Sequence, residues 1–181
     1  PAGELMRSPF DILEAYEQRS LQHAVQLPGR EFAAELWRGV GYRIGDRRLV
    51  SDFREVVEIV PMPQVTVVPG AQPWLLGVGN LRGNLFPVID LKYFLEGQFT
   101  SLSEGQRVLI VRQAGGDVAL TIDELYGQRS FTPGQAVEPG RLAQDRYRYF
   151  VDRAYHDDGH DWGVFSLSLL SRTPEFRHAA A

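Results

Sequence analysis

From residue 39 onward, short runs of β-branched and aromatic residues alternate with glycine and proline. Runs of this length, each closed by turn-forming residues, are typical of strands rather than helices. Many short strands at regular spacing favour a barrel or a pair of small barrels. The chain is therefore predicted to be all-β. The expected strands are 40–44, 47–50, 56–60, 65–68, 85–91, 107–113, 117–123, 126–131, 149–155 and 162–167.

The turn-forming residues and loops between these strands predict the organisation of the chain. Ala114-Gly115-Gly116 and Asp158-Gly159 are expected to close hairpins, because glycine and aspartate tolerate the backbone of tight turns. The segment 97–105 is weakly hydrophobic and contains glycine and serine. It is the expected boundary between a first barrel at about 38–98 and a second at about 106–172, within a domain spanning 37–176. An exchange of strands between the barrels stays open.

The first 36 residues differ from the rest in the spacing of their apolar residues, and they predict an N-terminal helical extension. Ser8 and Pro9 suit the cap and the first turn of a helix, and Pro28-Gly29 would end it. Spacings of three or four give a narrow apolar stripe, formed by Phe10, Leu13, Tyr16 and Leu27. Because the stripe is thin, this helix should pack on something. Residues 31–37 form either a second short helix or a solvated connector, and 177–181 are expected to be a frayed tail.

Composition excludes several classes of protein. With 19 basic and 23 acidic residues, the net charge of -4 does not suit a protein that binds nucleic acid. The absence of cysteine excludes disulfides, zinc–thiolate sites, iron–sulfur clusters and cysteine nucleophiles. No apolar run is long enough for a transmembrane helix, and no signal peptide is visible. We therefore expect a cytoplasmic protein.

No motif predicts catalysis. Two glycine-rich segments, 39–45 and 77–83, lack the glycine spacing and the strand-to-helix position of a dinucleotide-binding loop. One group of residues could ligate a metal: His156, Asp157, Asp158, His160 and Asp161. Because predicted strands flank this group, we favour the interpretation that it is a solvated hairpin tip. The prediction is therefore no catalytic residue, no metal and no cofactor.

The segment 74–91 is largely apolar and contains one cation, Arg82, which stands just before a predicted Gly83-Asn84 turn. Two interpretations of this arginine remain open. Its guanidinium could pair with a local carboxylate, such as Asp90 or Glu58, as a structural clamp. It could instead project a planar fork of five donors toward a partner protein, as arginine beside apolar surface commonly does.

Residues 76–91, with the string Gly-Val-Gly-Asn-Leu-Arg-Gly-Asn-Leu-Phe-Pro-Val-Ile-Asp-Leu, resemble the central signature of CheW-like coupling proteins. Segments 55–60, 118–123 and 163–170 resemble further strands and the closing helix of the same family. The resemblance covers about residues 38–172. The helical start and Trp37 are most similar to the PilI-type subgroup of twitching-motility systems.

This resemblance implies two five-stranded, SH3-like barrels separated by a hydrophobic cleft, and no enzymatic activity. It implies an adaptor that couples the cytoplasmic tip of a methyl-accepting chemoreceptor to the regulatory domain of a CheA-type histidine kinase at membrane-anchored receptor arrays. The output would be type IV pilus motility. The protein-binding positions carried over from the family are Val56, Glu58, Gly77 and Arg82. Alternatives are a coupling protein for flagellar chemotaxis and a small-ligand or metal-dependent barrel enzyme using 156–161.

Overall fold

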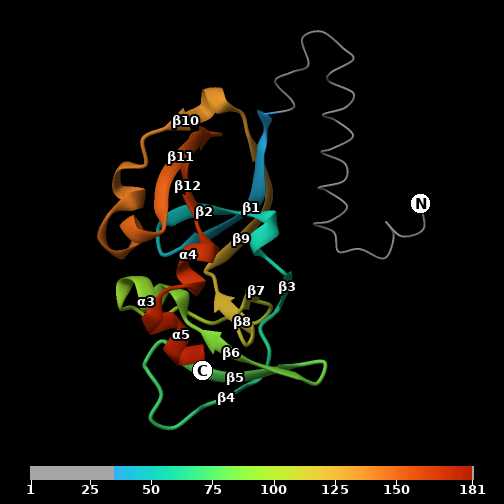
Figure 1. Ribbon diagram of the computed structural model, residues 1–181. Coiled ribbons are helices and arrows are strands. Elements are labelled where there is room, and N and C mark those ends of the chain that lie inside the picture. The colour runs from blue at the N-terminus through green and yellow to red at the C-terminus, as the bar shows by residue number, and fades with distance from the viewer. Residues whose placement is uncertain (1–34, 181) are drawn as a thin grey trace, which may run out of the picture.

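A computed structural model of the chain describes residues 35–180, and the side chains up to residue 177. The helix predicted between Ser8 and Leu27 lies outside the described residues. Twelve strands arranged in two six-stranded sheets make up most of the described chain, and a few short helices accompany them (Figure 1). The all-β prediction is confirmed.

The first sheet, sheet A, occupies the upper half of Figure 1 and has the order β10-β11-β12-β2-β1-β9. Five of its strands are long, and β10 contributes two residues at one edge. Its pairs are antiparallel except that β12 runs parallel to β2. The bounds are β1 (Trp37–Ile44), β2 (Arg47–Asp52), β9 (Glu124–Phe131), β10 (Ala136–Val137), β11 (Val151–Asp157) and β12 (His160–Phe165).

The second sheet, sheet B, lies below it and has the order β3-β7-β8-β6-β5-β4. It too contains five longer strands and one two-residue strand, β4, at an edge. Here the parallel pair is β6 with β8. The bounds are β3 (Glu58–Pro61), β4 (Val65–Thr66), β5 (Leu75–Leu81), β6 (Asn84–Ile89), β7 (Arg107–Gln113) and β8 (Gly116–Thr121).

The two sheets are nested along the chain rather than consecutive. Every strand of sheet B comes from between β2 and β9, whereas sheet A combines the first two strands with the last four. The expected boundary at 97–105 does not separate the sheets, because β6 precedes it and β8 follows it in the same sheet. The exchange of strands left open by the sequence is present, since β1 and β2 also pair with strands near the other end of the chain.

Short helices fill the space beside the sheets. They are η2 (Phe53–Glu55), α3 (Leu91–Glu96), η3 (Pro133–Gln135), η4 (Gly140–Ala143), η5 (Asp145–Tyr149), α4 (Leu167–Ser171) and α5 (Pro174–Ala180). The closing helix expected near 167–170 is confirmed as α4. The tail expected at 177–181 instead continues α5 through Ala180, because Phe176 is fully buried and anchors this helix. No helix in the described range 35–180 is long and apolar enough to cross a membrane.

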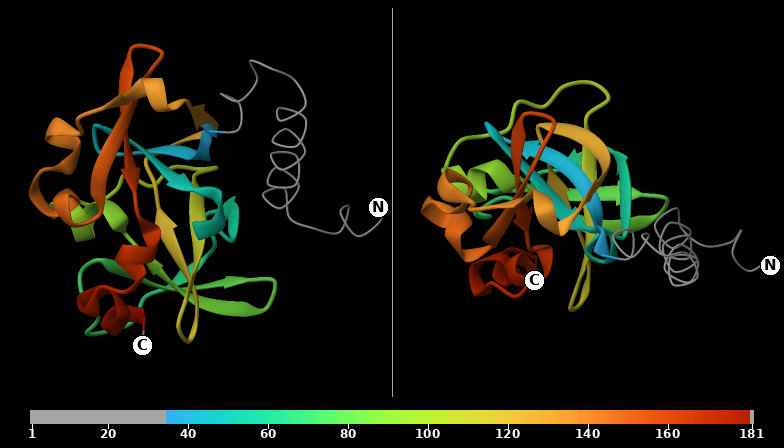
Figure 2. Two further views of the ribbon diagram at one scale, coloured as in Figure 1. Left: turned by 45° about the horizontal axis from the view of Figure 1, so that its top comes forward. Right: turned by 90° about the horizontal axis from the view of Figure 1, so that it is seen from above.

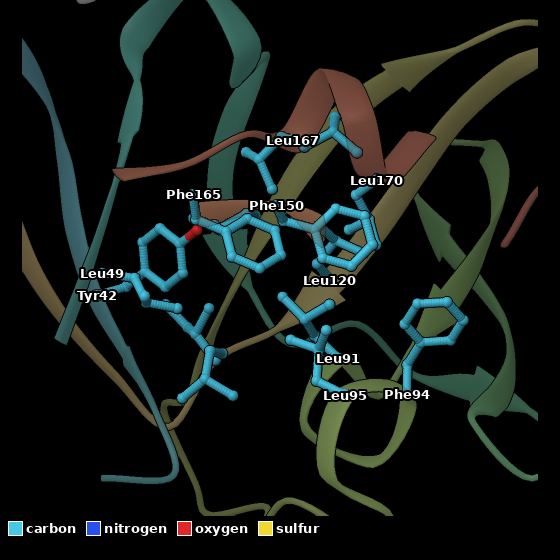
Figure 3. Packing of buried hydrophobic residues seen from close by; sticks show 14 of the residues in the cluster. Tyr42, Leu49, Leu91, Phe94, Leu95, Leu120, Phe150, Phe165, Leu167 and Leu170 are labelled. Atoms are coloured by element: carbon cyan, nitrogen blue, oxygen red, sulfur yellow. The ribbon is translucent and has the colours of Figure 1, made fainter. Parts of the chain in front are cut away.

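The largest core lies where the sheets meet. Figure 3 shows side chains from both sheets and from α3 and α4 pointing toward one another, among them Tyr42, Leu91, Leu120, Phe165 and Leu170. Two smaller clusters belong to single sheets: one around Val88 and Ile110 in sheet B, and one around Phe131 and Trp162 in sheet A. Because the main core is shared, burial of its apolar surface holds the sheets in one relative position.

Two local predictions around sheet B were incomplete. The strand β5 was not among the expected strands, because its glycines and Asn80 depress strand propensity. The strand expected at 85–91 ends at Ile89, and α3 begins at Leu91 because the side chain of Asp90 caps its first turn. Asp90 Oδ1 accepts a hydrogen bond from the Tyr93 amide at 3.1 Å.

A buried tyrosine makes the stability of this core sensitive to alkaline pH. The Tyr42 hydroxyl and Ser51 Oγ are 2.7 Å apart, and Ser51 Oγ donates to the Phe165 carbonyl. Tyr42 therefore donates to Ser51. Burial raises the pKa of the Tyr42 hydroxyl far above its usual value.

We expect the free energy of unfolding to fall as pH rises above about 10, where tyrosine in the unfolded chain loses its proton and the folded Tyr42 keeps it. Tyr42→Phe should flatten that fall by up to ~1.4 kcal/mol per pH unit. Urea unfolding at several pH values between about 9 and 11 measures the slope. Equal slopes for the variant and the natural chain would contradict this assignment.

Candidate functional site: the tip of the β5–β6 hairpin

The hairpin formed by β5 and β6 projects sideways from sheet B (Figures 1 and 2). Leu81 pairs with Asn84, so the two turn residues are Arg82 and Gly83. Their φ angles are 52° and 83°, as a type I′ turn requires at both central positions. The sequence placed the turn one residue later, at Gly83-Asn84, with Arg82 before it. Arg82 is in fact the first residue of the turn itself.

Arginine is a poor choice for this backbone position. A positive φ costs an L-residue with a long side chain roughly 1–2 kcal/mol, and type I′ turns normally place asparagine, aspartate or glycine there. The β11–β12 hairpin of the same chain follows that preference, with Asp158 at φ 51° and Gly159 at φ 77°. The arginine side chain therefore contributes something that the turn does not require.

The guanidinium of Arg82 bonds Glu58 on β3, a strand at the other edge of sheet B, with Arg82 Nη2 2.5 Å from Glu58 Oε1. The Arg82 side chain is 66% exposed and that of Glu58 is 43% exposed. An exposed pair of this kind contributes about 0–1 kcal/mol, which does not exceed the cost of the strained turn. Stability alone does not explain Arg82. Of the two carboxylates considered from the sequence, Glu58 is the partner, and Asp90 instead caps α3.

An apolar side chain completes the surface. Leu85 follows the turn on β6 and is 71% exposed. One hydrogen bond within the turn supports it, because the Gly83 amide donates to Asn80 Oδ1 at 3.1 Å. We call Glu58, Arg82, Gly83 and Leu85 the hairpin tip. An arginine that pairs with a carboxylate, keeps four further N–H groups and precedes an exposed leucine by three residues has the chemistry of an interface anchor. Leu85 was missed from the sequence, where it reads as an ordinary strand residue.

The other two predicted binding residues are buried. Val56 is 4% exposed and packs in the core shared by the sheets. Gly77 lies in β5 with φ +147°, and a Cβ there would overlap the Thr66 carbonyl oxygen on β4. Val56 therefore presents almost no side-chain surface to a partner, and Gly77 has no side chain to present. The structure thus brings Glu58 and Arg82 together, whereas Val56 and Gly77 are buried and closely packed.

Gly77→Ala is expected to separate β4 from β5, because neither backbone can absorb the added carbon without moving. We expect a loss of about 2–4 kcal/mol in the free energy of unfolding, measured by urea denaturation. Gly83→Ala is the matched control: its φ is also positive, but a methyl group at that position would have no neighbouring atom within 4 Å. A Gly77→Ala variant no less stable than Gly83→Ala would contradict the steric explanation.

The polar group at 156–161 forms the tip of the β11–β12 hairpin, as the favoured interpretation predicted. His156 Nδ1 lies 2.7 Å from Asp161 Oδ1, and His160 Nδ1 lies 3.0 Å from the Asp158 carbonyl. Among the residues that the structure describes, no three side chains of histidine, aspartate or glutamate are grouped to hold a metal ion. The hairpin tip at Arg82 is therefore the better candidate site.

Comparison with known proteins places this geometry in a family. Residues 38–175 match the family model described as the CheW-like domain. The chain belongs to the CheW-like family. The CheW-like resemblance seen in the sequence is confirmed, including its PilI-type character: the protein PilI of Pseudomonas aeruginosa is 31% identical over 175 residues, which cover 97% of this chain and 98% of that protein.

Other relatives align over about half of this chain. The chemotaxis protein CheW of Helicobacter pylori is 33% identical over 91 residues, covering 50% of this chain and 55% of that protein. FrzA of Myxococcus xanthus is 29% identical over 99 residues, covering 54% and 61%. The solved structure of the scaffolding protein TtCheW from Thermoanaerobacter tengcongensis superposes with a TM-score of 0.64 and 23% identity, over 76% of this chain and 93% of that one. That likeness supports the CheW-like fold.

Proposed function

We propose that this CheW-like protein is a non-catalytic adaptor that couples a methyl-accepting chemoreceptor to a CheA-type histidine kinase. The observation that carries the proposal is the hairpin tip: an arginine kept in a strained turn, paired to Glu58, exposed, and next to an exposed leucine. The residues 156–161 do not assemble a ligand set, so nothing in the described chain favours the metal-dependent enzyme considered from the sequence.

The mechanism would be geometric. The shared core fixes the two sheets relative to each other, so two partners bound to different faces would be held in a constant orientation. A change in the receptor could then alter kinase activity without any chemistry in this chain. Each contact is expected to be of modest size, about 1,200–2,000 Å² or less, and the multiplicity of an array would raise the effective affinity. The protein would act in the cytoplasm at membrane-anchored receptor arrays.

The alignment with PilI over nearly the whole chain favours an output to type IV pili. Alignments with the chemotaxis proteins CheW of Helicobacter pylori and Bacillus subtilis cover a smaller part of this chain, so a flagellar output is the second candidate. Deleting the gene in its own host separates the two, because the first predicts loss of twitching with normal swimming and the second predicts the reverse.

Co-sedimentation tests the adaptor role directly. The full chain is mixed with receptor-tip fragments and with the kinase regulatory domain, separately and together. We expect each partner to bring down the chain, and all three to sediment together. An adaptor that binds neither partner under array-forming conditions, or binds them only in competition, would refute the proposal.

A further inference from the structure

A groove of about 510 Å³ lies on the other sheet, away from the residues of the hairpin tip. It is lined by the start of β1, by η2 and by the segments leading into β11 and α4. Its apolar part includes Trp37, Tyr149 and Leu169, of which Tyr149 is 59% exposed and Leu169 is 45% exposed. We call this the Tyr149 groove. Two large apolar side chains exposed at one concavity suggest that something covers it.

Two arginines of the groove, Arg148 and Arg153, are exposed and available to a further partner. Within residues 35–180, no carboxylate forms a salt bridge with either one. Arg148 instead donates to the Tyr149 hydroxyl and lies over its ring. An acidic, apolar segment would complement this surface, because it could pair with the arginines and cover the ring.

The carboxylates that line the groove form no salt bridge with the two arginines, although Asp52 interacts electrostatically with Arg153. Asp52 accepts two bonds from the Arg54 side chain, and Glu55 accepts the Ser168 amide at 2.8 Å. Asp152, the third, is exposed at the rim between the two arginines in sequence. Arg148 is therefore the cation of the groove that is most open to a negatively charged occupant, and Arg153 is exposed beside it for a second contact.

We propose that the N-terminal segment 8–27 of this same chain occupies the Tyr149 groove. Its predicted helix carries the apolar stripe that requires a surface to pack on. Asp11, Glu14 and Glu17 each follow a stripe residue, Phe10, Leu13 and Tyr16, by one position. A helix would therefore place an acidic row along one edge of the apolar stripe. The acidic row could then pair with the arginines of the groove while the apolar stripe covers the Tyr149 ring.

The connection of the chain favours this occupant over a separate molecule. Trp37, the first residue of β1, is itself a lining residue of the groove. The segment therefore joins the described chain at the groove, through the nine residues 28–36. A tether of this length gives an effective concentration on the order of millimolar, which a free partner would have to exceed. This inference does not depend on receptor or kinase binding.

Cross-linking of the full chain tests the proposal. Because the chain contains no cysteine, two introduced thiols are the only ones present. Leu13→Cys on the apolar stripe is combined with Leu169→Cys in the groove. The matched control combines Ala15→Cys, on the opposite face of the predicted helix, with the same Leu169→Cys. Leu169 is partly exposed, so both pairs are expected to fold, and circular dichroism verifies it.

We expect the Leu13 pair to form an intramolecular disulfide at least tenfold faster than the Ala15 pair. Arg148→Glu combined with Arg153→Glu should slow that reaction severalfold, because the acidic row loses its partners. Equal rates for the two pairs would overturn the proposal. Disulfides formed mainly between chains would overturn it in favour of a second copy in the groove. As an independent measurement, Leu13→Asp should raise amide hydrogen exchange of residues 150–153, and unchanged exchange would also count against it.

Discussion

Arg82→Asn should weaken binding to one of the two proposed partners about thirtyfold, equivalent to ~2 kcal/mol, while leaving the chain as stable as before or slightly more so. Asparagine fits a positive φ better than arginine does, so the turn improves while the guanidinium is lost. The lost pair with Glu58 is exposed and contributes little to folding. Binding is measured by titration with each partner, and stability by urea unfolding.

Two control variants make that experiment decisive. Asp158→Asn changes the equivalent position of the β11–β12 turn and should affect neither binding nor stability. Arg82→Lys keeps the charge but removes the planar fork, and should recover only part of the affinity. If Arg82→Asn instead loses stability and binds both partners normally, Arg82 is a structural clamp, and the hairpin tip is not the docking site.

Asp90→Ala should lower the free energy of unfolding by about 3–5 kcal/mol, the largest effect expected of a single polar residue here. Asp90 is 1% exposed. Its carboxylate accepts from the Tyr93 amide, from the Thr100 amide at 2.9 Å and from the Thr100 hydroxyl at 2.7 Å. Alanine removes the cap of α3 and leaves buried donors without a partner. Urea denaturation measures the loss.

Asp90→Asn is the control for this prediction. Its remaining side-chain oxygen can still cap α3, because asparagine is as good an N-cap as aspartate. We expect it to cost clearly less than alanine. If the two substitutions cost the same, the negative charge rather than the number of hydrogen bonds determines the contribution of Asp90. A loss below about 1.5 kcal/mol for alanine would contradict the stabilising role assigned to the bonds that Asp90 accepts from Tyr93 and Thr100.

The sequence was sufficient to predict the fold class. It also predicted Glu58 as one of two carboxylates, with Asp90, that could pair with Arg82. Alternating apolar residues and turn-forming dipeptides report local structure. They predicted hairpins at 107–123 and 149–167, which the structure contains as β7–β8 and β11–β12. They carry no information on which distant strands pair. The parallel contact of β12 with β2 joins residues far apart in the chain, such as Gly163 and Leu49, so the nesting of the sheets could not be predicted from local patterns.

The candidate site was predictable only in part for a similar reason. A motif identifies residue types, but exposure depends on packing that the motif does not contain. Val56 and Gly77 stand in the same strings as Glu58 and Arg82, yet they are buried among β-strands. The strain at Arg82 was also hidden, because it depends on the exact register of Leu81 with Asn84. When the turn is placed one residue later, at Gly83-Asn84, Arg82 falls outside it and its positive φ angle is not expected.

The nesting of the sheets has a consequence for synthesis of the protein. Sheet B is complete once residue 121 has left the ribosome, whereas sheet A waits for β12 near the end of the chain. During that interval β1 and β2 lack their final neighbours, and their apolar faces are open to wrong contacts. Truncated products ending before His160 should therefore aggregate. The nascent chain would depend on rapid completion, or on chaperones, to protect its earliest strands.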